Sequence, residues 1–129
     1  MKRRFFLLIS ILILSILGCS KHNSYFNIEN ADNITILYGA SNYTLHSTDK
    51  EIVKIISENL NSLSFKATDK QMDPFSMFSI TLNKDTSLLA FVHVDSQGVF
   101  WIDDSSNCYE VKSGKFDYSY IKNIYDDKN

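Results

Sequence analysis

Two cysteines, three histidines and a group of acidic residues are the side chains of this sequence that are able to do chemistry, and Cys19 has the most informative surroundings. It follows a stretch in which the cations of residues 2–4 precede a run from Phe5 to Leu17 that is apolar except for two serines. A basic start, an apolar run of this length and a small residue, here Gly18, are typical of a secretory signal peptide. The run is too short for a membrane-spanning helix, which takes about 20 apolar residues.

The residues Ile16-Leu17-Gly18-Cys19 resemble the lipobox of bacterial lipoproteins, in which aliphatic and small residues precede an obligatory cysteine. This resemblance implies that the Cys19 thiol receives a diacylglyceryl group and that a signal peptidase cuts between Gly18 and Cys19. Two acyl chains anchor a protein stably, because each buried CH₂ contributes about 0.8 kcal/mol. The alternatives are a plain secretory signal with a chance cysteine, and an N-terminal anchor that is left uncut.

The mature chain expected after cleavage is mildly acidic. Its net charge falls from the −2 of the whole chain to −5, since cleavage removes Lys2, Arg3 and Arg4. Nucleic acid is not an expected partner, because its binding depends on clustered Lys and Arg. Attraction to anionic lipid is not expected either, so the predicted membrane contact is the lipid on Cys19. With that thiol modified, Cys108 has no partner for a disulfide.

The sequence divides into a signal peptide at 1–18, the lipidated cysteine with a polar tether at 19–32, and a single globular domain at 33–125. The Asn-rich tether, if flexible, spans about 20 Å r.m.s.. The remaining residues have the composition of a globular domain, since the chain is 44% hydrophobic and 13% aromatic.

Alternation of apolar and polar residues predicts an α+β domain with an antiparallel sheet, a meander, packed on one helix of the N-terminal half. That helix follows Thr48-Asp49-Lys50-Glu51, which reads as a capping box with Thr48 as N-cap, and it ends at Asn61-Ser62. Asp117 is expected to cap a short C-terminal helix over 118–125. The nearly continuous apolar run 87–94 predicts a central strand that is covered on both faces. The other predicted strands are 33–38, 43–46, 63–67, 75–83, 99–103 and 108–112.

Acidic residues gather near the turns of the predicted meander, at Asp95, Asp103, Asp104 and Glu110. Opposed turns bring such carboxylates together for Ca²⁺ binding or for acid–base catalysis. However, the calcium-loop pattern Asp-x-Asp-x-Asp-Gly is absent. We favour the interpretation that these residues make the turns soluble.

No metal or other cofactor is predicted. His22, His46 and His93 are far apart in the sequence and lack metal-ligand spacing, so we expect a solvated His22 and a packing His93. Cys108 has no cationic neighbour that would activate its thiol, which favours a structural role. Neither a Gly-x-Ser-x-Gly nucleophile motif nor a glycine-rich phosphate loop occurs.

Aromatic residues are concentrated in the C-terminal third of the chain. Exposed together, Trp101 and neighbouring tyrosines would suit the binding of a peptide or glycan, because they bury a large area at low entropic cost. We favour core packing under the terminal helix. The residues concerned are Phe100, Trp101, Tyr109, Phe116, Tyr118 and Tyr120.

The part after the tether resembles small lipoproteins that are common in AT-rich Gram-positive bacteria. The resemblance rests on the loose patterns Thr48–Ile52, Ile55-Ile56, Leu60–Phe65, Phe78–Leu82 and Tyr109–Val111. It implies a domain with no established activity and no catalytic residues to assign.

Three hypotheses of function follow. The first is a non-enzymatic, lipid-anchored binding or accessory domain on the extracytoplasmic face of the cell membrane, with a protein or cell-wall partner; an inhibitor or immunity-type protein is a variant of it. The second is a small envelope hydrolase that uses carboxylates such as Asp95, Asp103 or Asp104. The third is a structural or assembly subunit, which a large exposed apolar patch would favour.

Overall fold

The computed structural model describes residues 24–39, 41–102 and 106–128, which form seven strands and two helices. Gly18, Cys19, His22, Asp103 and Asp104 lie outside these ranges, so the lipobox and part of the acidic group stay predictions. In chain order the elements are β1 (Asn33–Tyr38), β2 (Thr44–Ser47), α2 (Lys50–Asn61), β3 (Ser64–Thr68), β4 (Phe78–Lys84), β5 (Ser87–Val94), β6 (Val99–Trp101), β7 (Cys108–Ser113) and α3 (Tyr118–Asp127).

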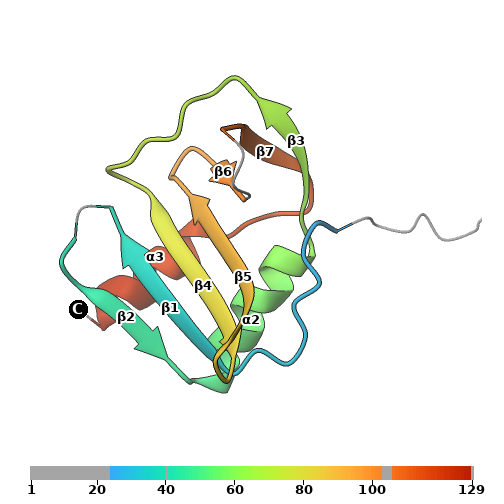
Figure 1. The fold of residues 1–129 in the computed structure, drawn as a ribbon. Coiled ribbons are helices and arrows are strands. Elements are labelled where there is room, and N and C mark those ends of the chain that lie inside the picture. Colours follow the sequence, from blue (N-terminus) through green and yellow to red (C-terminus); the bar gives the residue numbers. More distant parts are fainter. Residues whose placement is uncertain (1–23, 40, 103–105, 129) are drawn as a thin grey trace, which may run out of the picture.

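The described strands form one antiparallel sheet in the order β2-β1-β4-β5-β6-β7-β3, so the predicted α+β class is confirmed. Both helices lie behind the same face of the sheet (Figure 1). Val53 and Ile56 of α2 and Ile121 and Tyr125 of α3 share one buried cluster with the inward side chains of the strands. The pairing of β3 with β7 at the sheet edge was not predicted, because it joins strands that are far apart in the sequence.

Helix α2 forms where the sequence predicts it, but its N-cap is Asp49, so the predicted N-cap Thr48 is wrong by one residue. The Asp49 carboxylate accepts hydrogen bonds from the amides of Glu51 and Ile52, at 2.9 and 3.4 Å. A charged side-chain oxygen on these first-turn amides also interacts favourably with the positive end of the helix dipole. The helix ends at Asn61, as predicted.

Residues 24–32, which belong to the polar tether predicted at 19–32, pack against the domain. Phe26 and Ile28 are buried in the core. The Ile28 amide donates to the Asn61 side-chain oxygen at 2.8 Å, and the Asn61 amide group donates to the Ile28 carbonyl at 2.9 Å. The two apolar side chains reach the core beside the C-terminal end of α2, and any tether is therefore shorter than predicted.

Strand β5 is buried on one face only, so its predicted coverage on both faces is wrong. Ala90, Val92 and Val94 point into the core, whereas Leu88 and Phe91 are exposed. Because α2 and α3 lie on the same side of the sheet, its other side has no layer over it among the described residues.

Candidate binding face

The side of the sheet opposite the helices, called the outer face here, carries two rows of side chains that the strand register aligns. One row crosses five strands through Thr44, Leu37, Ser79, His93 and Trp101. The second row consists of His46, Thr35, Thr81 and Phe91. Side chains directly opposite each other in such rows are near neighbours. The register therefore assembles one surface from side chains that lie as far apart in the sequence as Thr35 and Trp101.

An aromatic strip of Phe91, His93 and Trp101 runs along the outer face. The rings of His93 and Trp101 stack, with centroids 5.0 Å apart and planes 14° apart. Phe91 meets His93 edge to face, with centroids 4.7 Å apart. Phe91 is 46% exposed and Trp101 is 40% exposed. Both large rings therefore face solvent while each of them contacts the ring of His93. Such rigid aromatic side chains lose little entropy on binding a ligand.

Hydroxyl groups beside the strip orient the two described histidines. The Ser79 hydroxyl and His93 Nδ1 are 2.7 Å apart, and the Thr35 hydroxyl and His46 Nδ1 are 2.9 Å apart. Each imidazole therefore has a fixed ring position and a second ring nitrogen that is not part of this contact. The outer face thus combines aromatic surface with hydrogen-bonding groups.

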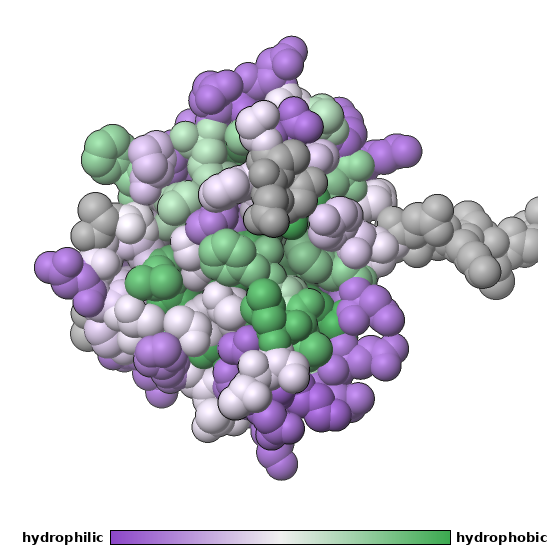
Figure 2. Space-filling model, viewed as in Figure 1, coloured by the Kyte–Doolittle hydropathy of each residue, from purple (hydrophilic) through white to green (hydrophobic). Residues whose placement is uncertain are grey.

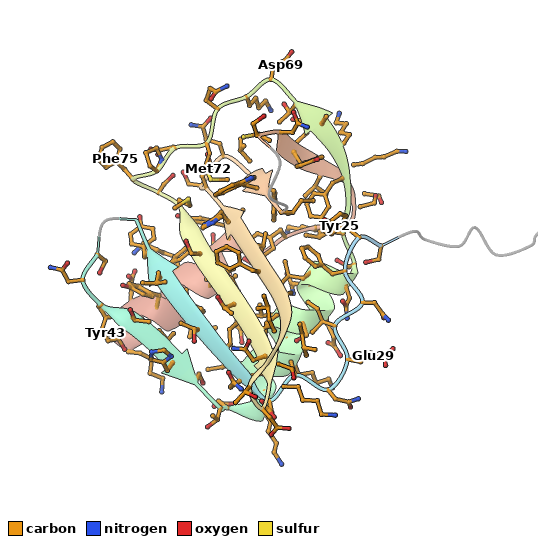
Figure 3. The ribbon with its side chains drawn as sticks, in the orientation of Figure 1. Tyr25, Glu29, Tyr43, Asp69, Met72 and Phe75 are labelled. Carbon is orange, nitrogen blue, oxygen red and sulfur yellow. The ribbon has the colours of Figure 1, made fainter. Side chains whose placement is uncertain are left out.

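Apolar side chains gather over the middle of the outer face and are surrounded by hydrophilic residues (Figure 2). The exposed large apolar residues in this part of the sheet are Leu37, Leu88, Phe91 and Trp101. Contiguous exposed apolar patches with a polar rim mark interaction sites. Phe75 is more exposed, at 79%, but it projects alone from the loop before β4 (Figure 3).

A groove of 540 Å³ lies at the edge of this patch. Its walls come from the N-terminal segment, including Tyr25 (Figure 3), and from β5 and the end of β6. This volume lies within the range of small-ligand sites. None of the described lining residues is acidic or carries a lysine or arginine charge; they are Tyr25, Phe26, Asn27, Leu88, Leu89, Ala90, Phe91, His93, Trp101 and Ile102.

Burial lowers the pKa of His93 below its ordinary value of 6.5. The unfolded chain then binds a proton more readily than the folded protein, so stability falls as the pH drops below about 6.5. We expect the wild type to lose more unfolding free energy than His93→Gln between pH 7.5 and pH 5, measured by urea denaturation. Parallel pH profiles of the two proteins would contradict this prediction.

Asp95, a member of the predicted acidic group, is fully buried and has a structural role. Its carboxylate accepts from the backbone amides of Asp73, Gln97 and Val99, at 2.8, 2.9 and 2.9 Å. The bonds to Gln97 and Val99 hold the turn after β5, and the bond to Asp73 fastens the loop before β4. A carboxylate whose two oxygens both accept from backbone amides is poorly placed to activate water.

Two other described acidic residues near this region, Glu110 and Asp73, also have ion-pair or hydrogen-bond partners. Glu110 binds the ammonium groups of Lys70 and Lys66, each at 2.9 Å, and these contacts lower the pKa of its carboxyl group. Hydrogen bonds from Ser76 and from the Phe75 amide lower the pKa of Asp73. Both carboxyl groups are therefore ionised at neutral pH and lack the raised pKa that a general acid needs.

The described residues contain no group of three or more His, Cys, Asp or Glu side chains arranged to hold a metal ion. His46 and His93 belong to different rows of the outer face and come from β2 and β5. Cys108 is half-buried in β7.

The aromatic C-terminal third divides between the core and the surface. Phe100 is buried, and Phe116, Tyr118 and Tyr120 pack partly buried against the core, as the core-packing interpretation predicts. Trp101 points the opposite way, onto the outer face. Sequence reasoning missed Phe91 and assigned His93 to packing. Their spacing of two residues in a predicted strand already placed both side chains on the same face. The uniform hydrophobicity of β5 concealed which of its side chains face outward.

A larger hollow of 870 Å³ lies between α2 and the N-terminal segment. Its lining mixes charges of both signs, from Lys50, Lys54, Asp32 and Glu58 among others. Asp32 already accepts two contacts from the Asp85 amide, at 2.9 and 3.0 Å, so its carboxylate serves the β4–β5 turn. The outer face is therefore the better candidate for a binding site.

The described residues thus define a small α+β domain with one uncovered sheet face. No protein-family model matches the chain, and no curated protein or solved structure is significantly similar to it. Among residues 24–39, 41–102 and 106–128, no helix is long and apolar enough to cross a membrane.

Proposed function

We propose that this chain is a bacterial lipoprotein, anchored by lipid on Cys19 to the extracytoplasmic face of the cell membrane, and that it binds a partner through its outer face without catalysing a reaction. The lipobox pattern supports the anchor. The domain contributes the binding surface. The antiparallel sheet backed by α2 and α3 gives that surface a rigid support, which lowers the entropic cost of binding.

The aromatic strip is the observation on which the binding proposal rests. Domains rarely leave two large aromatic side chains exposed so close together, because fully burying a Phe is worth about 1.5–3 kcal/mol. Here Phe91 and Trp101 stay exposed on either side of His93, because both helices of the described chain pack on the other face of the sheet. The hydrolase hypothesis has less support, since the buried Asp95 carboxylate is held by three backbone amides.

Photo-crosslinking in intact cells tests the proposal. Benzoylphenylalanine replaces Phe91 on the outer face or, as a matched control, the equally aromatic and exposed Phe75 outside it. We expect a crosslinked product of defined mass from position 91 and none of that mass from position 75. The benzoyl group that this residue adds has room in solvent at both exposed positions, so we expect the core to stay unchanged.

The mass of the product separates the alternatives. A product with twice the mass of the protein identifies a second copy and supports the assembly hypothesis in place of a separate partner. Absence of any product at position 91 contradicts the assignment of the outer face as the binding surface.

A further inference from the structure

We propose that the groove beside β5 binds an extended, uncharged peptide segment, which adds to β5 as a further strand along the part of its edge that no described strand pairs with. This inference rests on the proposed function and specifies the ligand class of the same surface. Strand addition uses main-chain hydrogen bonds for affinity and alternate side chains for specificity.

Strand β5 has an edge that its neighbour covers only in part. β5 spans Ser87–Val94, but β6 ends at Trp101 and pairs only with His93 and Val94. On its other side β5 pairs with β4 along its length. No strand of the described chain pairs with residues 87–92 on the β6 side, and backbone groups at such an edge form a template for another chain.

The groove provides room for one chain at this edge. β5 from Leu88 to Phe91 forms one wall, and the N-terminal segment at Tyr25–Asn27 forms the other, visible beside β5 in Figure 1. Because every strand rises by about 3.4 Å per residue, an added strand of about four residues matches the length of residues 88–91. Every second side chain of that strand would lie on the outer face, next to Phe91.

The chemistry of the groove selects an uncharged segment. None of the lining residues that the structure describes is acidic, and none is a lysine or arginine. The edge also lacks the lysines and prolines with which proteins protect free strand edges from pairing, since residues 87–91 read Ser-Leu-Leu-Ala-Phe. A charged segment would lose its hydration here without gaining a counter-charge.

A separate peptide fits this edge better than a second copy of the chain. An edge-to-edge pair of two β5 strands would bring the partner's own N-terminal segment against the first Tyr25–Asn27 wall. A single extended segment needs only the space between the two walls.

The test uses the full gene product, purified as it matures in a bacterial host, and a phage-displayed library of random dodecapeptides. The best selected peptide is synthesised unmodified and in two N-methylated forms, one methylated at odd and one at even positions of its central segment. We expect one form to bind at least about tenfold more weakly and the other to bind within about threefold of the unmodified peptide. Added strands point alternate amides at the edge, so only one set of methyl groups blocks pairing.

Two protein variants locate the site. Phe91→Lys places a charge at the groove wall and should weaken binding at least about tenfold, whereas Phe75→Lys, the matched control, should leave it unchanged. If Phe91→Lys weakens binding but both methylated peptides behave alike, strand addition is wrong and the outer face remains a binding surface. If no peptide is selected, if Phe91→Lys binds normally, or if sedimentation finds a dimer that Phe91→Lys dissociates, the inference is overturned.

Discussion

Cys19→Ala is expected to abolish both lipid attachment and the cut before residue 19, because the resemblance to the lipobox implies that this cysteine is obligatory. The variant should then keep Met1, whereas the wild type should begin at Cys19 and carry two acyl chains that hold it in the membrane. The mature sequence has a net charge near −5, so anionic lipid should not attract it, and we expect the lipid to account for the whole attachment. Intact-protein mass spectrometry of the membrane fraction measures lipid and cleavage together.

Cys108→Ala is the matched control for the anchor. It removes the second thiol of the chain from a half-buried position in β7 and should leave both lipid and membrane location unchanged. A wild-type protein with an unmodified Cys19 and an intact Met1 would contradict the prediction. That result would instead favour the uncut N-terminal anchor.

Asp95→Ala should lower the free energy of unfolding by about 3–5 kcal/mol. The change leaves the amides of Asp73, Gln97 and Val99 without their acceptor. A buried unsatisfied donor costs about 1–3 kcal/mol, which applies in full to the buried Val99 bond and in part to the two partly buried ones. Water cannot replace the carboxylate easily, because the side chain is 0% exposed. Since domains of this size are stable by only about 5–15 kcal/mol, the loss is a large share of the total. Urea denaturation measures it.

Two further variants isolate the carboxylate of Asp95. Asp95→Asn keeps the oxygen that serves Gln97 and Val99 but turns an amide group toward the Asp73 amide, so we expect an intermediate loss. Asp69→Ala, in the exposed loop after β3 (Figure 3), should change stability by less than about 0.5 kcal/mol. A loss below about 1 kcal/mol for Asp95→Ala would show that its three hydrogen bonds contribute little.

Local patterns in the sequence predicted the elements whose stability is local. The spacing of Val53, Ile56 and Leu60 defines the buried face of α2, and the alternation of Phe78, Ile80 and Leu82 defines the inward face of β4. The capping residue Asp117 starts α3 as predicted. These signals depend on neighbours within a few residues, which the sequence displays directly.

Features that depend on distant parts of the chain were not predicted. The apolar run of β5 has the composition of a strand buried on two faces, and only the placement of both helices on one side exposes Phe91. The tether prediction failed for the same reason, since Phe26 and Ile28 look isolated until α2 and β3 are next to them. The outer face likewise depends on strand register, which brings together side chains as far apart in the sequence as Thr35 and Trp101.

If Cys19 carries the lipid as proposed, the packed N-terminal segment limits how far the domain can lie from the bilayer. Five residues separate Cys19 from Tyr25, where the groove wall begins. Fully extended, five residues reach about 18 Å. So short a connection would keep the domain in the layer next to the bilayer, and its partner would have to reach the membrane surface or be embedded there.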